Sequence, residues 1–452
     1  MRRRDVLKLP AAAALGSRAR AAERGRPNII FILADDLGYG DLGCYGQKQI
    51  LTPNLDRMAS EGLRFTQAYS GSTVCAPSRC CLMTGKHSGH ATVRGNIKPE
   101  AGLKPDEPTV ASLLQGAGYR TALFGKWGLG GPGTGSVPNT RGFDEFYGYL
   151  DQQHAHNTYP EHLWDNQHEA LLIGNWFYQR KQFSHDLFTD RALKFAAGSR
   201  EPFFLYLAYT IPHVNNELGA LTGNGMETPD DRPYSDRPWP QVERNFAALV
   251  TRMDRDIGRL FAALKQSGRD ENTLVIFTSD NGPHQEGGHR PDFFQSNGPL
   301  RGIKRDLYEG GIRVPYIARW PGHVPAGRAT DQVVTFWDFL PTAAELAGVA
   351  APRGIDGIST LPAHLGRPQA QQHEYLYWEF HEGGFAQGVR TGNLKCFRRN
   401  PGETVEVYDL SADPGERNNI ASKTPDAVRR AEELFRAART DSDIFPIRPT
   451  RK

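Results

Sequence analysis

The sequence predicts an α/β protein built on a large, mostly parallel sheet flanked by helices, with a smaller C-terminal α+β domain containing an antiparallel sheet. Short continuous apolar runs alternate with helical patterns from about residue 26 to 349, as expected for strands covered on both faces. Four of these runs end in polar groups. After about residue 350, apolar runs joined by glycine-containing turns replace the alternation.

The apolar runs predict strands at residues 28–33, 119–124, 203–208, 274–278, 374–380, 385–397 and 405–410. Helical patterns predict helices at residues 108–118, 186–197, 241–266 and 425–439. The helix at 241–266 carries its apolar side chains at helical spacing. We therefore expect an export signal at 1–21, a catalytic domain at 26–349 and a smaller domain at 350–452.

The first 21 residues concentrate positive charge. The formal net charge is +3, but residues 1–21 contribute +5, so the remainder carries −2 and nucleic acid is not an expected partner. Arg2-Arg3-Arg4, a brief apolar run and Ala19-Arg20-Ala21 resemble a twin-arginine signal with a cleavage site, although a basic tail is the alternative. No later stretch is apolar for long enough to span a membrane. These features predict a periplasmic or secreted protein.

The stretch from Ser72 to Lys86 predicts a loop, a proline in the first turn of a helix, and a helix. Cys75 is expected just before that helix, where free N–H groups favour an anion, with Arg79 one turn further on. A nucleophile beside an arginine suits sulfate or phosphate chemistry. Taken alone, Cys75 could equally be a small buried cysteine. The five cysteines form an odd set and predict no disulfide framework.

Four predicted strands end in polar residues, and the carboxyl ends of parallel strands are where sites form in open α/β sheets. The residues concerned are Asp35 and Asp36, Lys126, His213, and Asp280 with Asn281. Adjacent strand residues point to opposite faces, so Asp35 and Asp36 converge only if the chain turns there, which Gly38 and Gly40 permit. We therefore predict one site that includes Cys75.

Several motifs together resemble the sulfatase family, arylsulfatase A-like, of the alkaline phosphatase superfamily. The Cys75-x-Pro77-Ser78-Arg79 motif resembles the signature in which cysteine is oxidised to Cα-formylglycine. The other matching stretches are residues 27–40, 53–56, 125–127, 279–282, 308–315, 320–322, 408–410 and 413–416. The resemblance runs from about residue 27 to 421 and implies an alkaline phosphatase-like fold with a mixed sheet.

The resemblance implies a calcium ion, with magnesium as an alternative, because the ligands are hard oxygens. Its implied ligands are Asp35, Asp36, Asp280, Asn281 and the modified Cys75. Arg79, Lys126, His213 and Lys304 match sulfate-contacting positions; outside the family, Lys304 would be a solvated charge and His213 a capping or core histidine.

The implied mechanism is covalent catalysis by the hydrated aldehyde. Asp280 is the expected base for the attacking hydroxyl, and His213 or Lys304 the expected acid for the leaving alkoxide. Arg79, Lys126 and the metal would offset charge on the sulfuryl oxygens.

One position departs from the family pattern. Many relatives carry histidine two residues after the lysine, where this chain has Gly128. That role is unassigned, with His154, His156 and His284 as candidates to approach the site.

The loop from Gln152 to Trp164 is rich in aromatic and hydrogen-bonding side chains. We expect His154, His156, Tyr159 and His284 to bind substrate, and a sulfated carbohydrate to be that substrate. A folded surface insertion is the alternative reading of the loop.

Two other functions remain open: a phosphodiester or phosphonate monoester hydrolase on the same fold, and a non-catalytic binder of sulfated glycans. Retention of all the motif residues argues against the binder. The expected partners are a formylglycine-generating enzyme and the twin-arginine export machinery, with Cys75 modified in the cytoplasm before the folded protein leaves.

Overall fold

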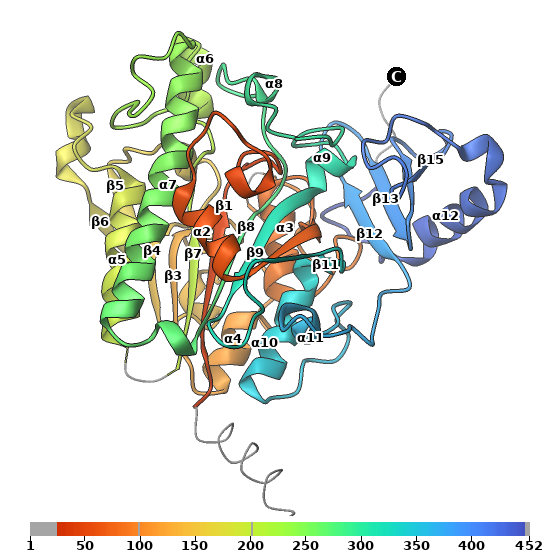
Figure 1. Ribbon diagram of the computed structural model, residues 1–452, viewed down its shortest axis with the longest axis horizontal. Helices are drawn as coiled ribbons and strands as arrows, with labels where there is room; N and C mark the ends of the chain where they lie inside the picture. The colour runs from red at the N-terminus through yellow and green to blue at the C-terminus, as the bar shows by residue number, and fades with distance from the viewer. Residues whose placement is uncertain (1–24, 98–99, 200–201, 448–452) are drawn as a thin grey trace, which may run out of the picture.

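A computed structural model describes residues 25–447 except 98–99 and 200–201. The predicted export signal at 1–21 lies outside the described residues. Two sheets organise this part of the chain (Figure 1). The larger has the order β10-β2-β9-β8-β1-β7-β3-β4-β5-β6, with β11 also paired to β2, and the smaller has the order β12-β13-β14-β15.

The strands of the large sheet are β1 (Asn28–Ala34), β2 (Leu63–Tyr69), β3 (Arg120–Lys126), β4 (Glu145–Tyr149), β5 (His162–Asp165), β6 (His168–Leu171), β7 (Phe203–Ala208), β8 (Thr273–Ser279), β9 (Arg313–Arg319), β10 (Arg328–Thr330) and β11 (Val334–Thr335). Its central strands β8, β1, β7, β3 and β4 run parallel, whereas β9 pairs antiparallel with both β8 and β2. The prediction of a large, mixed and mostly parallel sheet is confirmed.

The helices are α2 (Pro53–Glu61), α3 (Cys75–Thr84), α4 (Val110–Gly116), α5 (Ser184–Gly198), α6 (Asn216–Thr222), α7 (Gln241–Gln266), α8 (Pro291–Phe294), α9 (Glu309–Ile312), α10 (Phe339–Ala347), α11 (Leu361–His364) and α12 (Pro425–Ala437). Among the described residues, none of them is both long and apolar enough to cross a membrane. Each of the four predicted helices is present, and the prediction for α7 matches at both ends.

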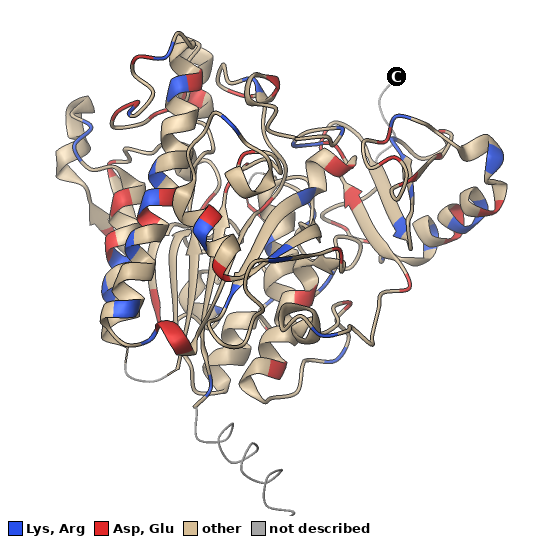
Figure 2. Cartoon of the chain, in the orientation of Figure 1, with Lys and Arg blue, Asp and Glu red and all other residues tan. Residues whose placement is uncertain are grey.

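The core lies on both faces of the large sheet because successive strand residues point to opposite sides. Along β1, Ile29 and Phe31 join the core under α3, α4 and α10, whereas Ile30 and Ile32 join the core under α2, α5 and α7. Burial on both faces explains the continuous apolar runs. Figure 2 shows charged residues on outer helices such as α7 and α12 and few along the central strands.

The smaller sheet comprises β12 (Leu376–Phe380), β13 (Ala386–Thr391), β14 (Leu394–Arg398) and β15 (Glu406–Asp409), all antiparallel. It packs with α12 around a separate core that includes Val407 and Phe435. Trp378 of β12 reaches the core of the large sheet, where its indole N–H donates to the Ser70 carbonyl oxygen at 3.0 Å. The predicted C-terminal α+β region is therefore present, with the antiparallel sheet that the sequence indicates.

Candidate active site

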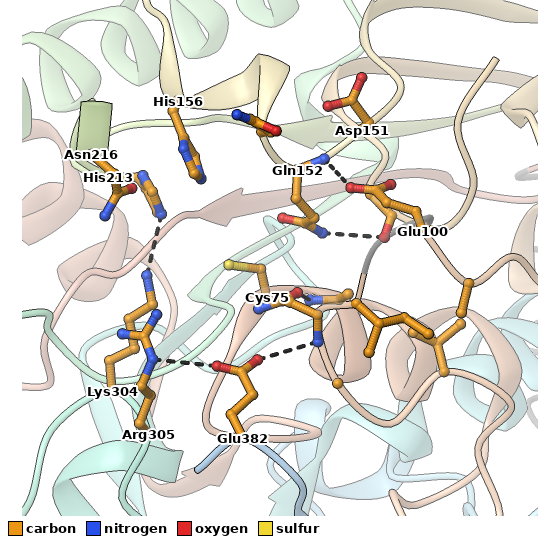
Figure 3. A pocket seen from close by; sticks show the side chains of 18 of the residues that line it. Cys75, Glu100, Asp151, Gln152, His156, His213, Asn216, Lys304, Arg305 and Glu382 are labelled. Carbon is orange, nitrogen blue, oxygen red and sulfur yellow. Dashed lines mark hydrogen bonds and ion pairs between the residues drawn. The ribbon is translucent and has the colours of Figure 1, made fainter. Parts of the chain in front are cut away.

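Cys75 is the first residue of α3 and follows Val74, which is extended at φ −146° and ψ 163°. The prediction placed it one residue earlier, just before the helix. Its thiol lines a cavity at the carboxyl ends of the central strands (Figure 3). Burial raises the pKa of the Cys75 thiol well above its usual range, with Lys126 opposing that shift. The unmodified side chain is therefore a protonated thiol at neutral pH and not the reactive thiolate.

Asp35 and Asp36 follow β1 and are both fully buried. Asp36 adopts φ 66°, so the chain turns at this residue and both carboxylates enter the same site. The sequence indicated a turn permitted by Gly38 and Gly40; the left-handed residue is Asp36 itself. Gly38 instead allows the backbone at Ser296 to pack closely against it, because a Cβ at residue 38 would lie 2.2 Å from the Ser296 carbonyl oxygen.

Two cations hold Asp35 and Asp280. The Arg79 guanidinium donates to Asp280 Oδ2 through Nε at 3.2 Å and Nη2 at 2.8 Å, and lies 3.3 Å from Asp35 Oδ2. Lys126, the last residue of β3, donates from Nζ to Asp35 Oδ2 at 2.8 Å. Both cations are buried, so their charges act with little screening by water.

The pKa values of Asp35 and Asp280 are shifted in opposite directions. Burial acts to raise the pKa of Asp35, but Lys126, His213 and Arg79 outweigh it and hold that pKa well below its usual range. Burial and the charge of Asp35 raise the pKa of Asp280 to about 7, against the opposing effect of Arg79. The site therefore contains carboxylates with well-separated proton affinities.

His213 and Lys304 form a donor–acceptor pair. His213 Nδ1 donates to the Val214 carbonyl oxygen at 2.7 Å, which leaves Nε2 to accept from Lys304 Nζ at 3.2 Å. Lys304 also donates to Asp36 Oδ2 at 2.8 Å and to Glu286 Oε2 at 3.1 Å. Because His213 Nδ1 is used as a donor to Val214 and Lys304 contacts two carboxylates, Lys304 is the proton-bearing member of the pair and His213 the acceptor.

The site has oxygen atoms with no hydrogen-bond partner. Asp35 Oδ1 and Asn281 Oδ1 are both buried without one, although Asn281 Nδ2 donates to Asp36 Oδ1 at 2.8 Å. Unpaired buried acceptors are costly unless something completes them. Together with Asp36 and Asp280, they offer the hard oxygen ligands that Ca²⁺ and Mg²⁺ prefer. The residues present therefore fit a divalent cation.

The predicted substrate residues fall into different places. His156, in the short helix η3 (His154–His156), lines the cavity; its ring stacks on His213 at a centroid distance of 5.1 Å, and its Nδ1 lies 3.0 Å from Glu217 Oε2. His284 is fully buried, its ring centroid 6.2 Å from that of His213. His154, Tyr159 and His284 are not among the residues that line the cavity. His154 packs on Tyr149 and His162, and Tyr159 on Phe183.

Gly128 has a structural reason to lack a side chain. It adopts φ 70°, and a Cβ there would lie 2.1 Å from Gln152 Nε2, which donates to the Gly128 carbonyl oxygen at 3.1 Å. Gln152 therefore occupies the space beside this position. In Figure 3 it lies near Cys75, on the side of the cavity away from Lys304.

Sequence reasoning missed several cavity-lining polar residues: Asn96, Glu100, Asp151, Asn216, Glu217, Glu286 and Glu382. Most lie in loops without a motif. Of these residues, only Glu286 could have been predicted from the sequence, because it follows the Asp280-Asn281-Gly282 stretch by a few residues. A loop residue reaches a site through the path of the chain, which spacing alone does not indicate.

A nucleophile position at a helix start, paired carboxylates and buried cations at the strand ends define an enzyme that acts on an anionic ester. The sulfatase family model matches residues 27–349, and the model for the C-terminal region of N-sulphoglucosamine sulphohydrolase matches residues 303–435. The chain belongs to the sulfatase family and is an enzyme that hydrolyses sulfate esters.

Relatives extend along most of the chain. Human arylsulfatase A is 33% identical, with 90% of this chain and 87% of that protein covered. N-acetylgalactosamine-6-sulfatase from Canis lupus familiaris is 30% identical, with 93% and 81% covered. A crystal structure of Ps i-CgsB in complex with k-i-k-neocarrahexaose superposes with a TM-score of 0.79 at 29% identity, covering 92% of this chain and 94% of that one.

Proposed function

We propose that this sulfatase hydrolyses a sulfate monoester on a carbohydrate and that Cys75 is first converted to Cα-formylglycine. One observation carries the proposal: Cys75 Sγ, an Asp35 oxygen, an Asp36 oxygen and a His213 nitrogen all lie within 4.8 Å of one another at the cavity wall. A nucleophile formed at residue 75 would thus stand beside both the carboxylates and the proton-handling pair. In the motif Cys75-x-Pro77-Ser78-Arg79, the cysteine is the residue that is modified.

Asp35, Asp36, Asp280 and Asn281 would hold Ca²⁺, together with an oxygen of the modified residue 75. The unpaired Asp35 Oδ1 and Asn281 Oδ1 support this assignment. When bound, the cation supplies Lewis-acid stabilisation of negative charge on oxygen.

Asp280 would accept the proton of the attacking hydroxyl at residue 75. Its Oδ1 accepts only the Asp36 backbone N–H at 3.1 Å, whereas its Oδ2 is held by Arg79. Arg79 thereby orients the carboxylate through Oδ2, while Oδ1 accepts the single hydrogen bond from Asp36. Orientation by a neighbouring group is what a general base requires.

Lys304 would donate a proton to the leaving oxygen, and His213 would hold Lys304 in place through Nε2. In the observed hydrogen bonds Lys304 is the donor and His213 Nε2 is the acceptor. Arg79 and Lys126 would offset the charge on the sulfuryl oxygens.

A carbohydrate suits the cavity, whose volume is about 660 Å³. Ala76, Val93, Ile97 and Ala101 give it an apolar side, and carboxylates and amides line the rest. A sugar ring matches that combination because it has an apolar face and a rim of hydroxyls. The dog relative is named for a sugar sulfate, and Ps i-CgsB binds a neocarrahexaose in its crystal.

The arginine-rich start of the chain supports export through the twin-arginine route to the periplasm or beyond. A formylglycine-generating enzyme would act on Cys75 in the cytoplasm, before this export. The aldehyde should already be present in cytoplasmic precursor, and finding it only in exported protein would contradict this order.

Two measurements test the proposed function. The mass of the tryptic peptide from Phe65 to Arg79 should show the loss that accompanies conversion of cysteine to the aldehyde. Protein with that mass should hydrolyse 4-nitrophenyl sulfate faster than 4-nitrophenyl phosphate, bis(4-nitrophenyl) phosphate or a phosphonate monoester. Faster hydrolysis of a phosphorus ester would favour the alternative hydrolase, and binding of sulfated glycans without turnover would favour the binder.

A further inference from the structure

The cavity above Cys75 carries an uneven distribution of charge. Its described lining includes five carboxylates and two permanent cations. The carboxylates are Glu100, Asp151, Glu217, Glu286 and Glu382, and the cations are Lys304 and Arg305. Carboxylates outnumber cations in this lining, which by itself would disfavour an anionic substrate. The position of each charge therefore decides where an anionic group can bind.

The two cations are already paired. Lys304 contacts Asp36 and Glu286. Arg305 lies between two carboxylates, with Nη1 on Glu286 Oε1 and Nε 3.3 Å from Glu382 Oε2. Neither cation therefore offers an uncompensated charge to a second anionic group on a substrate.

The carboxylates lie around the cavity on more than one side. In Figure 3, Asp151 and Glu100 lie across Cys75 from Lys304 and Arg305, and Glu382 lies on a third side. Glu382 also accepts the Asn96 backbone N–H at 3.2 Å, and Glu217 holds His156. These contacts orient Glu382 and Glu217 and leave both with acceptor capacity, because a carboxylate has about four lone-pair sites.

Apart from Arg305, which is paired with Glu286 and Glu382, the positive charges lie at the inner end, beside Cys75. Arg79, Lys126 and Lys304 lie there, and a bound divalent cation would add to them. One sulfate fits that end. A second sulfate or a carboxylate, carried elsewhere on the same sugar, would instead approach Asp151 and Glu217, which contact the His154 backbone N–H and His156 rather than Lys304 or Arg305. Like charges placed opposite each other are a means of rejecting a ligand.

We propose that the substrate is a sugar with the scissile sulfate as its only anionic group. Asp151, Glu217 and Glu382 accept hydrogen bonds from its hydroxyl or amide N–H groups and exclude a second anion. This inference rests on the proposed function and specifies its substrate class. It places specificity in side chains that belong to none of the sulfatase motifs.

Matched sugar sulfates test the inference. Each pair shares the sulfate position and differs by one anion: N-acetylglucosamine 6-sulfate against glucosamine 2-N,6-O-disulfate, and N-acetylgalactosamine 4-sulfate against its 4,6-disulfate. The formylglycine form gives kcat/KM from sulfate release, and Cys75→Ala protein gives affinity by calorimetry. We expect the singly charged member of at least one pair to be favoured by about tenfold or more in both measurements.

Glu382→Gln and Glu217→Gln should narrow that preference several-fold by improving binding of the doubly charged member. Glu403→Gln is the control, because Glu403 is exposed and does not line the cavity, and it should leave the preference unchanged.

The possible failures are distinguishable. If 4-nitrophenyl sulfate is turned over and the doubly charged sugars react equally well or better, the inference is wrong while the proposed function stands. Turnover of 4-nitrophenyl sulfate with none of the sugars would also overturn it. If protein carrying formylglycine hydrolyses no sulfate ester, the proposed function fails and the inference fails with it.

Discussion

Two clusters of buried charge differ in how completely they are paired. The active-site cluster consists of Asp35, Asp36, Arg79, Lys126, Asp280 and Asn281. The interface cluster, which joins the large sheet to the small one, consists of Tyr69, Glu309, Arg313, Arg390, Lys395 and Glu416. All but the part-buried Arg313 are buried, and both clusters bring acids and bases from distant parts of the chain together.

In the interface cluster, both oxygens of the central carboxylate, that of Glu309, have hydrogen-bond donors. Glu309 Oε1 accepts from Lys395 Nζ at 3.0 Å, and its Oε2 accepts from the Tyr69 hydroxyl at 2.7 Å and from Arg313 at 3.3 Å. Burial acts to raise the pKa of Glu309, but Lys395 and the arginines outweigh it and hold that pKa at about 2. Lys395 also lies 3.1 Å from Glu416 Oε1.

In the active-site cluster, Asp35 Oδ1 and Asn281 Oδ1 have no hydrogen-bond partner. Glu416 Oε1 of the interface cluster also has none, but it lies 3.1 Å from Lys395 Nζ, so a cation of the chain itself compensates it. We interpret the interface cluster, whose carboxylates are compensated within the chain, as structural. The active-site cluster has oxygens without a partner, which a bound cation can complete. The comparison teaches that the pairing of each atom, more than burial or charge, separates the functional cluster from the structural one.

The largest expected effect is on activity in the active-site cluster. Lys126→Met removes the cation on Asp35 and should lower kcat/KM for 4-nitrophenyl sulfate by about 10³, or roughly 4 kcal/mol of transition-state stabilisation. Lys194→Met, at an exposed position of α5, is the control. Retention of more than about a tenth of the activity would remove Lys126 from the catalytic machinery.

The matching change in the interface cluster should act on stability. Lys395→Met leaves Glu309 and Glu416 buried without their shared cation and should lower the free energy of unfolding by about 3–5 kcal/mol. Urea unfolding measures this effect, with exposed Lys423→Met as the control. The remaining folded protein should keep most of its activity, and a loss as large as that of Lys126→Met would break the distinction between the clusters.

A smaller effect concerns pH. Burial raises the pKa of Glu416 from 4.5 to about 7, with Lys395 opposing and Glu309 adding to the shift. The folded state therefore holds this proton more tightly than the unfolded state. The resulting stabilisation is complete below pH 4.5 and is lost as the pH rises through about 7.

Glu416→Gln cannot titrate and should not show this loss. Between about pH 5 and about pH 8, wild-type protein should lose on the order of 1–3 kcal/mol of stability relative to Glu416→Gln, as measured by urea unfolding at each pH. Exposed Glu403→Gln should follow the wild type. Parallel curves for wild type and Glu416→Gln would place the Glu416 pKa near its ordinary value.

The sequence predicted the parts of the site that lie at strand ends. Asp35, Lys126 and Asp280 follow apolar runs, and burial on both faces makes such runs recognisable from residue order alone. Parallel pairing then brings their carboxyl ends together: Lys126 contacts Asp35 directly, and Arg79 bridges Asp35 and Asp280.

The rest depended on tertiary structure. Tyr159 and His154 lie in the loop expected to bind substrate, yet they pack on Phe183, Tyr149 and His162 away from the cavity. Glu217 reaches the cavity from the short helix α6 and Glu382 from the turn between β12 and β13, and the positions of both segments are set by contacts far away in sequence. Aromatic content indicated a packed loop but not the direction of each side chain.

The most direct test of the comparison is a calcium titration of chelator-treated protein, followed through the unfolding temperature. Because a ligand that binds only the folded state stabilises it, Ca²⁺ at about 100 times its dissociation constant should add roughly 2.7 kcal/mol and raise the unfolding temperature. Asn281→Ala should weaken the response, and Asn393→Ala, at an exposed turn of the small sheet, should keep it. An unfolding temperature that responds to neither Ca²⁺ nor Mg²⁺ would contradict the claim that the active-site cluster is completed by a cation.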